Sequence, residues 1–181
     1  MFIQTEDTPN PATLKFIPGQ TVMPSGTIDF SSVDGAARSP LARRLFAVDG
    51  VARVFFGSDF ITVTKAAGND WHVMKPALLG AIMEHFTSGQ PVLPAAESDG
   101  HAQGGDSEVV AQIKELLDSR VRPAVAQDGG DILFDRFEDG VVYLEMRGSC
   151  SGCPSSLATL KSGVENMLRH YIPEVNEVRA V

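Results

Sequence analysis

The feature that most constrains the fold is a long stretch without apolar periodicity in the middle of the chain. Residues 89–106 read GQPVLPAAESDGHAQGGD, which is rich in proline, glycine and small polar residues. Such a composition buries too little surface to offset the entropy lost on ordering, so we predict a flexible linker. The linker divides the 181 residues into segments 1–88 and 107–181. We therefore expect two small domains rather than one large one.

Both segments show strand and helix patterns, and the predicted fold class is α/β (α+β), with two small mixed α/β domains joined by the linker. In the first segment we predict strands at 13–17 and 27–30, a helix at 39–46, a hairpin at 51–65 and a helix at 71–87. In the second we predict a helix from 107 to near Pro123, a hairpin at 132–146, a helix at 154–171 and a strand at 175–181. The last three strands are expected to form one mixed sheet.

Charge and hydropathy exclude several classes of partner. The net charge is −8, which disfavours nucleic acid and anionic membranes because phosphate contacts need lysine and arginine. The apolar stretch 77–83 is too short to span a bilayer. The first seven residues carry acid and no basic cluster, so they read as neither a signal nor a transit peptide. We predict a bacterial cytoplasmic location, or the mitochondrial matrix only if a targeting peptide has been removed.

The strongest chemical signal is the run Cys150-Ser151-Gly152-Cys153, which contains the only two cysteines of the chain. It lies on a tight loop before a predicted helix, where unpaired N–H groups and a partial positive charge favour thiolate over thiol. Gly148 and Gly152 let backbone amides approach sulfur, and Arg147 can add positive charge. Thiolates are the donors that soft metals and iron–sulfur clusters require.

Four interpretations of this pair remain open at this point. A redox dithiol fits the spacing but not the position late in the chain, after a hairpin. Structural zinc needs four ligands, and none of the four histidines has finger spacing from the pair. The cysteines can be incidental, although reactive thiols at an open helix start are prone to oxidation. Finally, two chains related by a twofold axis can pool four thiolates around a shared cluster.

Motifs beyond the cysteine pair extend over nearly the whole chain outside the linker. Those of the second segment are Arg122-Pro123, Asp128-Gly129-Gly130-Asp131, Gly140-Val141-Val142-Tyr143, residues 148–156, Thr159-Leu160-Lys161-Ser162-Gly163 and Ile172-Pro173-Glu174-Val175. Those of the first are residues 8–16, Ser39-Pro40-Leu41-Ala42, Val48-Asp49-Gly50-Val51 and Val54-Phe55-Phe56. On these residues the chain resembles Nfu-type iron–sulfur proteins, with an Nfu N-terminal domain (1–88) and a NifU-like C-terminal domain (107–181).

The resemblance implies a scaffold or carrier for iron–sulfur clusters rather than an enzyme. It implies that Cys150 and Cys153 are the cofactor-binding and metal ligands, holding a [4Fe–4S] cluster, or a [2Fe–2S] cluster, that bridges a homodimer. The implied partners are apo iron–sulfur proteins as recipients and upstream assembly machinery as donor. We hypothesise that the N-terminal domain recognises recipients.

Other residues carry weaker expectations. The run Asp128-Gly129-Gly130-Asp131 is interpreted as a turn with glycine at positive φ. Thr8-Pro9-Asn10-Pro11 fits a stiff turn or a partner epitope equally well. Three side chains, Trp71, Met74 and Met83, are expected in a helix core, and His72 and His85 are expected to be exposed or hydrogen-bonded.

Overall fold

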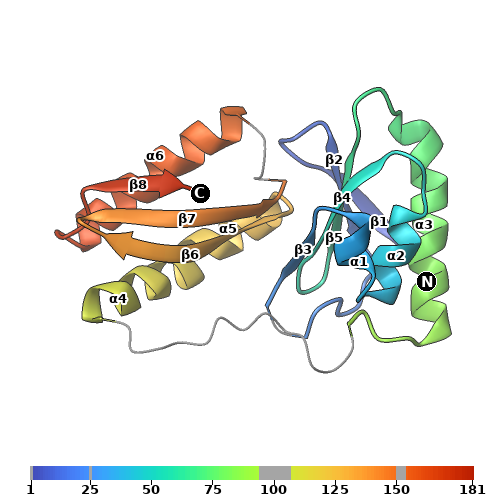
Figure 1. Cartoon of the computed structure of the whole chain (residues 1–181), viewed down its shortest axis with the longest axis horizontal. Helices are drawn as coiled ribbons and strands as arrows, with labels where there is room; N and C mark the ends of the chain where they lie inside the picture. Colours follow the sequence, from blue (N-terminus) through green and yellow to red (C-terminus); the bar gives the residue numbers. More distant parts are fainter. Residues whose placement is uncertain (1, 25, 94–106, 150–153) are drawn as a thin grey trace. The chain divides into compact units, whose positions relative to one another are not determined.

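The computed structural model describes residues 2–24, 26–93, 107–149 and 154–181 (Figure 1). The chain forms two compact units, Met1–Gly100 and His101–Val181. Each unit contains a β-sheet and helices with its own hydrophobic core, so the predicted fold class of two mixed α/β domains is confirmed. Most of the predicted linker, residues 94–106, lies outside the described residues.

The first unit is built on a five-stranded antiparallel sheet with the order β1-β2-β5-β4-β3. Its central hairpin pairs β4 with β5, as the alternating apolar pattern predicted. The edge strand β1 was not predicted, because its acidic residues carry no apolar alternation. The strands are β1 (Gln4–Asp7), β2 (Thr13–Ile17), β3 (Ile28–Phe30), β4 (Val51–Phe56) and β5 (Ile61–Lys65).

Helices α2 (Pro40–Phe46) and α3 (Trp71–Ser88) pack against each other on one face of this sheet (Figure 1). The Ser39 hydroxyl accepts a hydrogen bond from the N–H of Ala42 at 3.2 Å, which confirms the predicted cap. The short helix α1 (Val33–Ala36) was not predicted. The buried core consists of residues from β2 to β5 and the inner faces of α2 and α3, among them Phe16, Phe56, Leu41, Leu45, Leu78 and Ile82.

Two expectations about α3 are corrected by its burial pattern. Met74 is buried and Trp71 is half-buried against the core, but Met83 is exposed because it lies on the outer face of the helix. His85 is fully buried and neither of its ring nitrogens has a hydrogen-bond partner, whereas an exposed or hydrogen-bonded side chain was expected. The helix also continues through Pro76 to Ser88.

The second unit is built on three strands, β6 (Gly130–Glu138), β7 (Val141–Gly148) and β8 (Glu177–Ala180). Strands β6 and β7 are antiparallel, and β8 lies parallel to β7, so the predicted mixed sheet is confirmed. Asp139 (φ 49°) and Gly140 (φ 77°) form the two-residue turn between β6 and β7. Two successive positive φ values are the geometry that Asp-Gly turns favour in hairpins.

The first helical segment of this unit is longer than predicted. Helix α4 (Glu108–Leu116) continues through a π-helical turn, η1 (Leu117–Val121), into α5 (Arg122–Gln127). Pro123 was expected near the helix end because it lacks the N–H that an α-helical bond needs. The wider turn of η1 precedes it, and the proline occupies the first turn of α5, where no such bond is required.

Helix α6 (Pro154–Tyr171) crosses between the parallel strands β7 and β8. Along β7 the residues Val142, Leu144 and Met146 are buried and alternate with more exposed ones, so one face of the sheet carries the core. From the helices, that core includes Ile113, Leu117, Val125, Val164 and Leu168. The side chains of both cores, as far as the described residues form them, are aliphatic, aromatic or methionine.

Candidate functional site

The cysteine pair, Cys150 and Cys153, lies outside the described residues, and the structure defines both of its flanks. Strand β7 ends at Gly148, and helix α6 begins at Pro154. The predicted hairpin before the pair and the predicted helix after it are therefore confirmed, while the conformation of the pair itself stays a prediction. The first turn of α6, at the end of the helix where its dipole is positive, therefore follows directly after the second cysteine along the chain.

The residue before the first cysteine is anchored to the rest of the unit. Ser149 is only 3% exposed. Its N–H donates to the carbonyl of Gly129 at 3.3 Å, and its hydroxyl donates to the carbonyl of Asp128. Gly148 has φ 66°, a conformation that glycine adopts without steric cost. The chain therefore enters the cysteine loop from a fixed direction.

Ser149 is anchored to the turn that precedes β6. The turn itself was predicted from the Gly129-Gly130 pair. Gly129 has φ 78°, and Gly130 pairs with Gly148 across the ladder. Without a Cβ, these residues bring the two backbones together at the end of the hairpin. The turn thus supports the cysteine loop directly, which goes beyond its predicted role as a simple connection.

An ion pair between a buried carboxylate and a partly buried arginine fixes this turn to the helical segment. Asp131 is 3% exposed and accepts two hydrogen bonds from Arg122, from Nε and from Nη2, both at 2.9 Å. Its Oδ1 also accepts the N–H of Ile132 at 2.8 Å. Arg122 donates a further bond to the exposed Asp118 at 3.0 Å. The hydrogen bonds to Asp131 raise the pKa of Arg122 above its ordinary value, so its charge is permanent.

The sequence did not reveal this ion pair. Arg122 and Asp131 lie nine positions apart on a helix and a strand, and only the fold brings them together. The only signal in the sequence was that both residues belong to motifs of the resemblance.

Arg147 does not supply a free positive charge beside the loop. Its guanidinium is paired with the Glu145 carboxylate, with Nε to Oε1 at 3.0 Å, and its side chain is 12% exposed. The expected contribution of Arg147 to thiolate formation is therefore offset by Glu145. The N-terminus of α6 remains as the positive feature that the described residues provide.

Within residues 2–24, 26–93, 107–149 and 154–181, no group of three or more histidine, cysteine or carboxylate side chains could hold a metal ion. His72 and His170 are exposed, His85 is buried in the first unit, and His101 lies outside the described residues. Nor does any described helix have the length and apolarity needed to cross a bilayer.

The fold and the loop together define a class of protein. The chain matches the family model "Scaffold protein Nfu/NifU N terminal" over residues 3–89 and the model "NifU-like domain" over residues 113–179. It also matches full-length curated relatives at more than half identity. The chain therefore belongs to the Nfu/NifU family, and the resemblance noted from its motifs is confirmed.

Three relatives illustrate this similarity. The human "NFU1 iron-sulfur cluster scaffold homolog, mitochondrial" is 55% identical over 183 residues, which cover all of this chain and 72% of the relative. The Arabidopsis thaliana "NifU-like protein 4, mitochondrial" is 54% identical, covering 98% of this chain and 65% of the relative. The Drosophila willistoni protein with the same name as the human one is 54% identical and is covered to 64%. The chain thus spans about two thirds of the length of these relatives.

The names of these relatives overturn one prediction. All three are named as mitochondrial, so the predicted bacterial cytoplasmic location is wrong. That prediction rested on the composition of the first seven residues. A folded domain can have the same amino-acid composition in either compartment. The composition of these seven residues therefore does not distinguish the bacterial cytoplasm from the mitochondrion.

Proposed function

We propose that this protein is an iron–sulfur cluster scaffold and carrier whose cargo is held by Cys150 and Cys153. The observation that carries the proposal is the position of the only two cysteines, directly between the anchored end of β7 and the start of α6. The names of its relatives, which describe iron–sulfur cluster scaffolds, support it. The proposed organisation is a recognition domain at 1–88, a flexible linker at 89–106 and a cluster-binding domain at 107–181.

The number of thiols leads to the proposed oligomeric state. A [4Fe–4S] or [2Fe–2S] cluster commonly takes four cysteine thiolates, and one chain supplies two. Two copies related by a twofold axis supply four, so the cargo bridges a homodimer. We propose [4Fe–4S] as the cargo, with [2Fe–2S] as the alternative that the same ligands can hold.

The residues around the loop have distinct roles in this proposal. The Ser149 hydrogen bonds to the Asp128–Gly129 turn hold the incoming strand, and the Arg122–Asp131 pair holds that turn. The positive end of α6 stabilises the thiolates without adding a side-chain donor that would compete for iron. The protein therefore positions two thiolates and leaves the remaining coordination to its partner copy.

Delivery to an apo-protein proceeds in this proposal by ligand exchange at iron. A thiolate of the recipient forms a new iron–sulfur bond as the bond to Cys150 or Cys153 breaks, and the released thiolate takes up a proton from water. The exchange needs no oxidant or reductant and no catalytic residue. We therefore propose a carrier rather than an enzyme, loaded by upstream assembly machinery and located in mitochondria like its named relatives.

Anaerobic reconstitution of the full chain with ferrous iron and sulfide tests this proposal. We expect a broad absorption band near about 400 nm, about two irons per chain, and a shift from the apo mass to a dimer in analytical ultracentrifugation. A holoprotein that binds all of its iron as a monomer would contradict the shared site. A colourless protein that instead reduces insulin disulfides would point to the redox dithiol.

Substitutions in the loop test the ligands. Cys150→Ala and Cys153→Ala are each expected to abolish cluster binding and cluster-dependent dimerisation while the far-ultraviolet circular dichroism of the apo-protein stays unchanged. Ser151→Ala is the matched control, since it changes the same loop without removing a thiol, and it should load normally. Full iron content in either cysteine variant would refute the assignment.

A further inference from the structure

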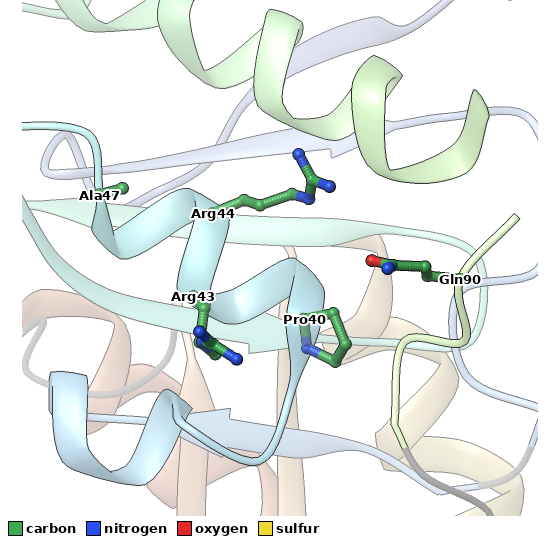
Figure 2. A pocket seen from close by; sticks show the side chains of 5 residues that line it. All are labelled: Pro40, Arg43, Arg44, Ala47 and Gln90. Atoms are coloured by element: carbon green, nitrogen blue, oxygen red, sulfur yellow. The ribbon is translucent and has the colours of Figure 1, made fainter. Parts of the chain in front are cut away.

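The first unit contains an open pocket that the proposed cluster chemistry does not use. It has a volume of about 380 Å³ and is lined by Pro40, Arg43, Arg44, Ala47 and Gln90. Four of these residues lie on or next to the α2 helix, and Gln90 comes from the segment that follows α3 (Figure 2). Figure 2 shows the Arg44 and Gln90 side chains extending toward each other across this space.

Both charged residues of the pocket are arginines. Arg44 already binds a carboxylate, since its Nη1 lies 2.7 Å from Oε1 of Glu84 on α3. Glu84 is 69% exposed, so an incoming carboxylate can replace it at little cost. Arg43 is exposed, and in the part of the chain that the structure describes it forms no ion pair. The pocket therefore offers one unneutralised guanidinium beside a second one that accommodates a carboxylate.

A buried histidine lies next to the pocket. His85 is fully buried, and neither ring nitrogen has a hydrogen-bond partner. Burial lowers the pKa of His85, and the positive charge of Arg44 lowers it further. The imidazole is therefore neutral near pH 7, and the positive charge of the pocket comes from the two arginines alone.

The chemistry of the lining selects among anions. Phosphate sites commonly use backbone N–H groups at a helix N-terminus, but here the Ser39 hydroxyl already caps α2 and also donates to the Val92 carbonyl at 2.6 Å. The pocket is lined instead by side chains. A planar guanidinium matches a carboxylate in two parallel hydrogen bonds, and a Gln amide can donate to and accept from a peptide group.

We propose that this pocket binds a carboxylate side chain of an acidic peptide segment in a partner protein. The carboxylate bonds Arg43 and Arg44, Gln90 bonds the adjacent peptide group, and Pro40 and Ala47 contact the aliphatic stem. Identifying that partner as a recipient apo-protein rests on the function proposed above. The pocket itself is independent of the cysteine loop.

Fluorescence anisotropy of a fluorescein-labelled decapeptide of alternating glutamate and alanine, titrated with the full-length apo-protein, tests the proposal. Arg43→Gln is expected to weaken binding by about tenfold, the usual effect of losing one charge-assisted bidentate contact. Gln90→Ala should weaken it less. The matched control is Arg38→Gln, which removes the same charge from an exposed side chain of the same unit that does not line the pocket.

Three outcomes overturn the proposal. Equal weakening by Arg38→Gln and Arg43→Gln would mean non-specific attraction to positive charge. Equal affinity for a peptide with glutamine in place of glutamate would exclude the carboxylate. Displacement of the peptide by inorganic phosphate at much lower concentration than by glutarate would assign the pocket to phosphate. Cluster loading of Arg43→Gln is expected to equal that of the wild type. Peptide binding and cluster loading are therefore measured separately, and the pocket proposal can fail while the cluster proposal holds.

Discussion

At the scale of single residues, the contact between Arg122 and Asp131 explains how the turn that holds Ser149 is fixed to the helical segment of the second unit. The Asp131 carboxylate is almost fully buried and bonds two guanidinium nitrogens and a backbone N–H. Removing the charge of Asp131 leaves the partly buried guanidinium of Arg122 without its main partner, which is more costly than losing an exposed pair. The turn that anchors Ser149 depends on this interaction.

Substitution of Asp131 by asparagine is therefore expected to lower the free energy of unfolding of the second unit by about 3 kcal/mol. Asp118→Asn is the matched control, because Asp118 binds the same arginine but is 64% exposed, and it should cost less than about 0.5 kcal/mol. Urea denaturation of the apo-protein followed by circular dichroism measures both. Equal effects of the two variants would show that burial of the carboxylate does not matter.

His85 gives the first unit a pH dependence of known sign. Its pKa is lowered in the folded state, so the unfolded chain binds the proton more tightly. The free energy of unfolding of the first unit is therefore fully retained above the unfolded-state pKa of about 6.5. It decreases as the pH drops below that value. Between pH 6.5 and 5.5 we expect the buried imidazole to contribute a loss of up to about 1 kcal/mol, because the histidine of the unfolded chain is already half-protonated at pH 6.5.

The variant His85→Leu, which cannot titrate, should show a smaller loss of stability over the same interval in urea denaturation at each pH. His72→Leu is the matched control, since it makes the same change at an exposed histidine of the same helix. If His85→Leu kept the full slope, other groups would be responsible.

At the scale of helices and strands, the sequence predicted most elements because their apolar residues recur at the period of the structure they form. Strand β2, helix α2 and the two hairpins follow directly from such patterns and from Pro and Gly at the turns. Strand β1 could not be predicted, because it is an edge strand whose pairing with β2 is made by the backbone. The π-helical turn η1 could not be predicted either, since an apolar pattern does not distinguish it from an α-helix.

The candidate site was predictable only in part, for a related reason. A strand end, two thiols and a helix start follow one another along the chain, so local sequence reveals them. The support for this loop comes from Asp128 and Gly129 at a distance of some twenty positions, and from Arg122 beyond them. Side-chain contacts of that kind depend on the final packing, which periodicity does not encode.

The turn between β6 and β7 illustrates how one element constrains another. Gly140 has φ 77°, and a Cβ at this position would lie 2.2 Å from Nδ2 of Asn176. Its carbonyl also accepts the N–H of Asn176 at 2.7 Å, which joins the turn to the segment before β8. The turn therefore sets the register of the hairpin and the position of the last strand.

Gly140→Ala is expected to lower the free energy of unfolding of the second unit by about 2 kcal/mol through backbone strain and the clash with Asn176. Gly163→Ala is a control of opposite sign. Gly163 is exposed within α6 and an added Cβ would contact nothing within 4 Å, so alanine should stabilise the unit by about 0.5–1 kcal/mol. Thermal or urea unfolding of both variants measures the pair. Destabilisation by both would contradict this account.

At the scale of the whole molecule, the two units have separate hydrophobic cores, and the single tryptophan, Trp71, belongs to the first. Tryptophan fluorescence therefore reports on the first unit, while circular dichroism reports on both. This separation makes the independence of the two units measurable in the intact chain.

Leu168→Ala removes a fully buried side chain from the second core and should cost about 3 kcal/mol there. The urea midpoint from Trp71 fluorescence is expected to stay unchanged, while part of the circular dichroism transition moves to lower urea. Leu78→Ala in the first core is the reciprocal control and should shift the fluorescence midpoint. A common shift of both signals in either variant would show that the units unfold together.

In the part of the chain that the structure describes, both hydrophobic cores are formed without a thiol, which bears on how this protein responds to peroxide. Oxidation of Cys150 and Cys153, to a sulfenic acid or to a disulfide, changes none of the side chains that form these described cores. We therefore expect oxidative stress to inactivate the molecule without denaturing it. Since both products are reversible, a thiol reductant should restore cluster binding without refolding or new synthesis of the protein.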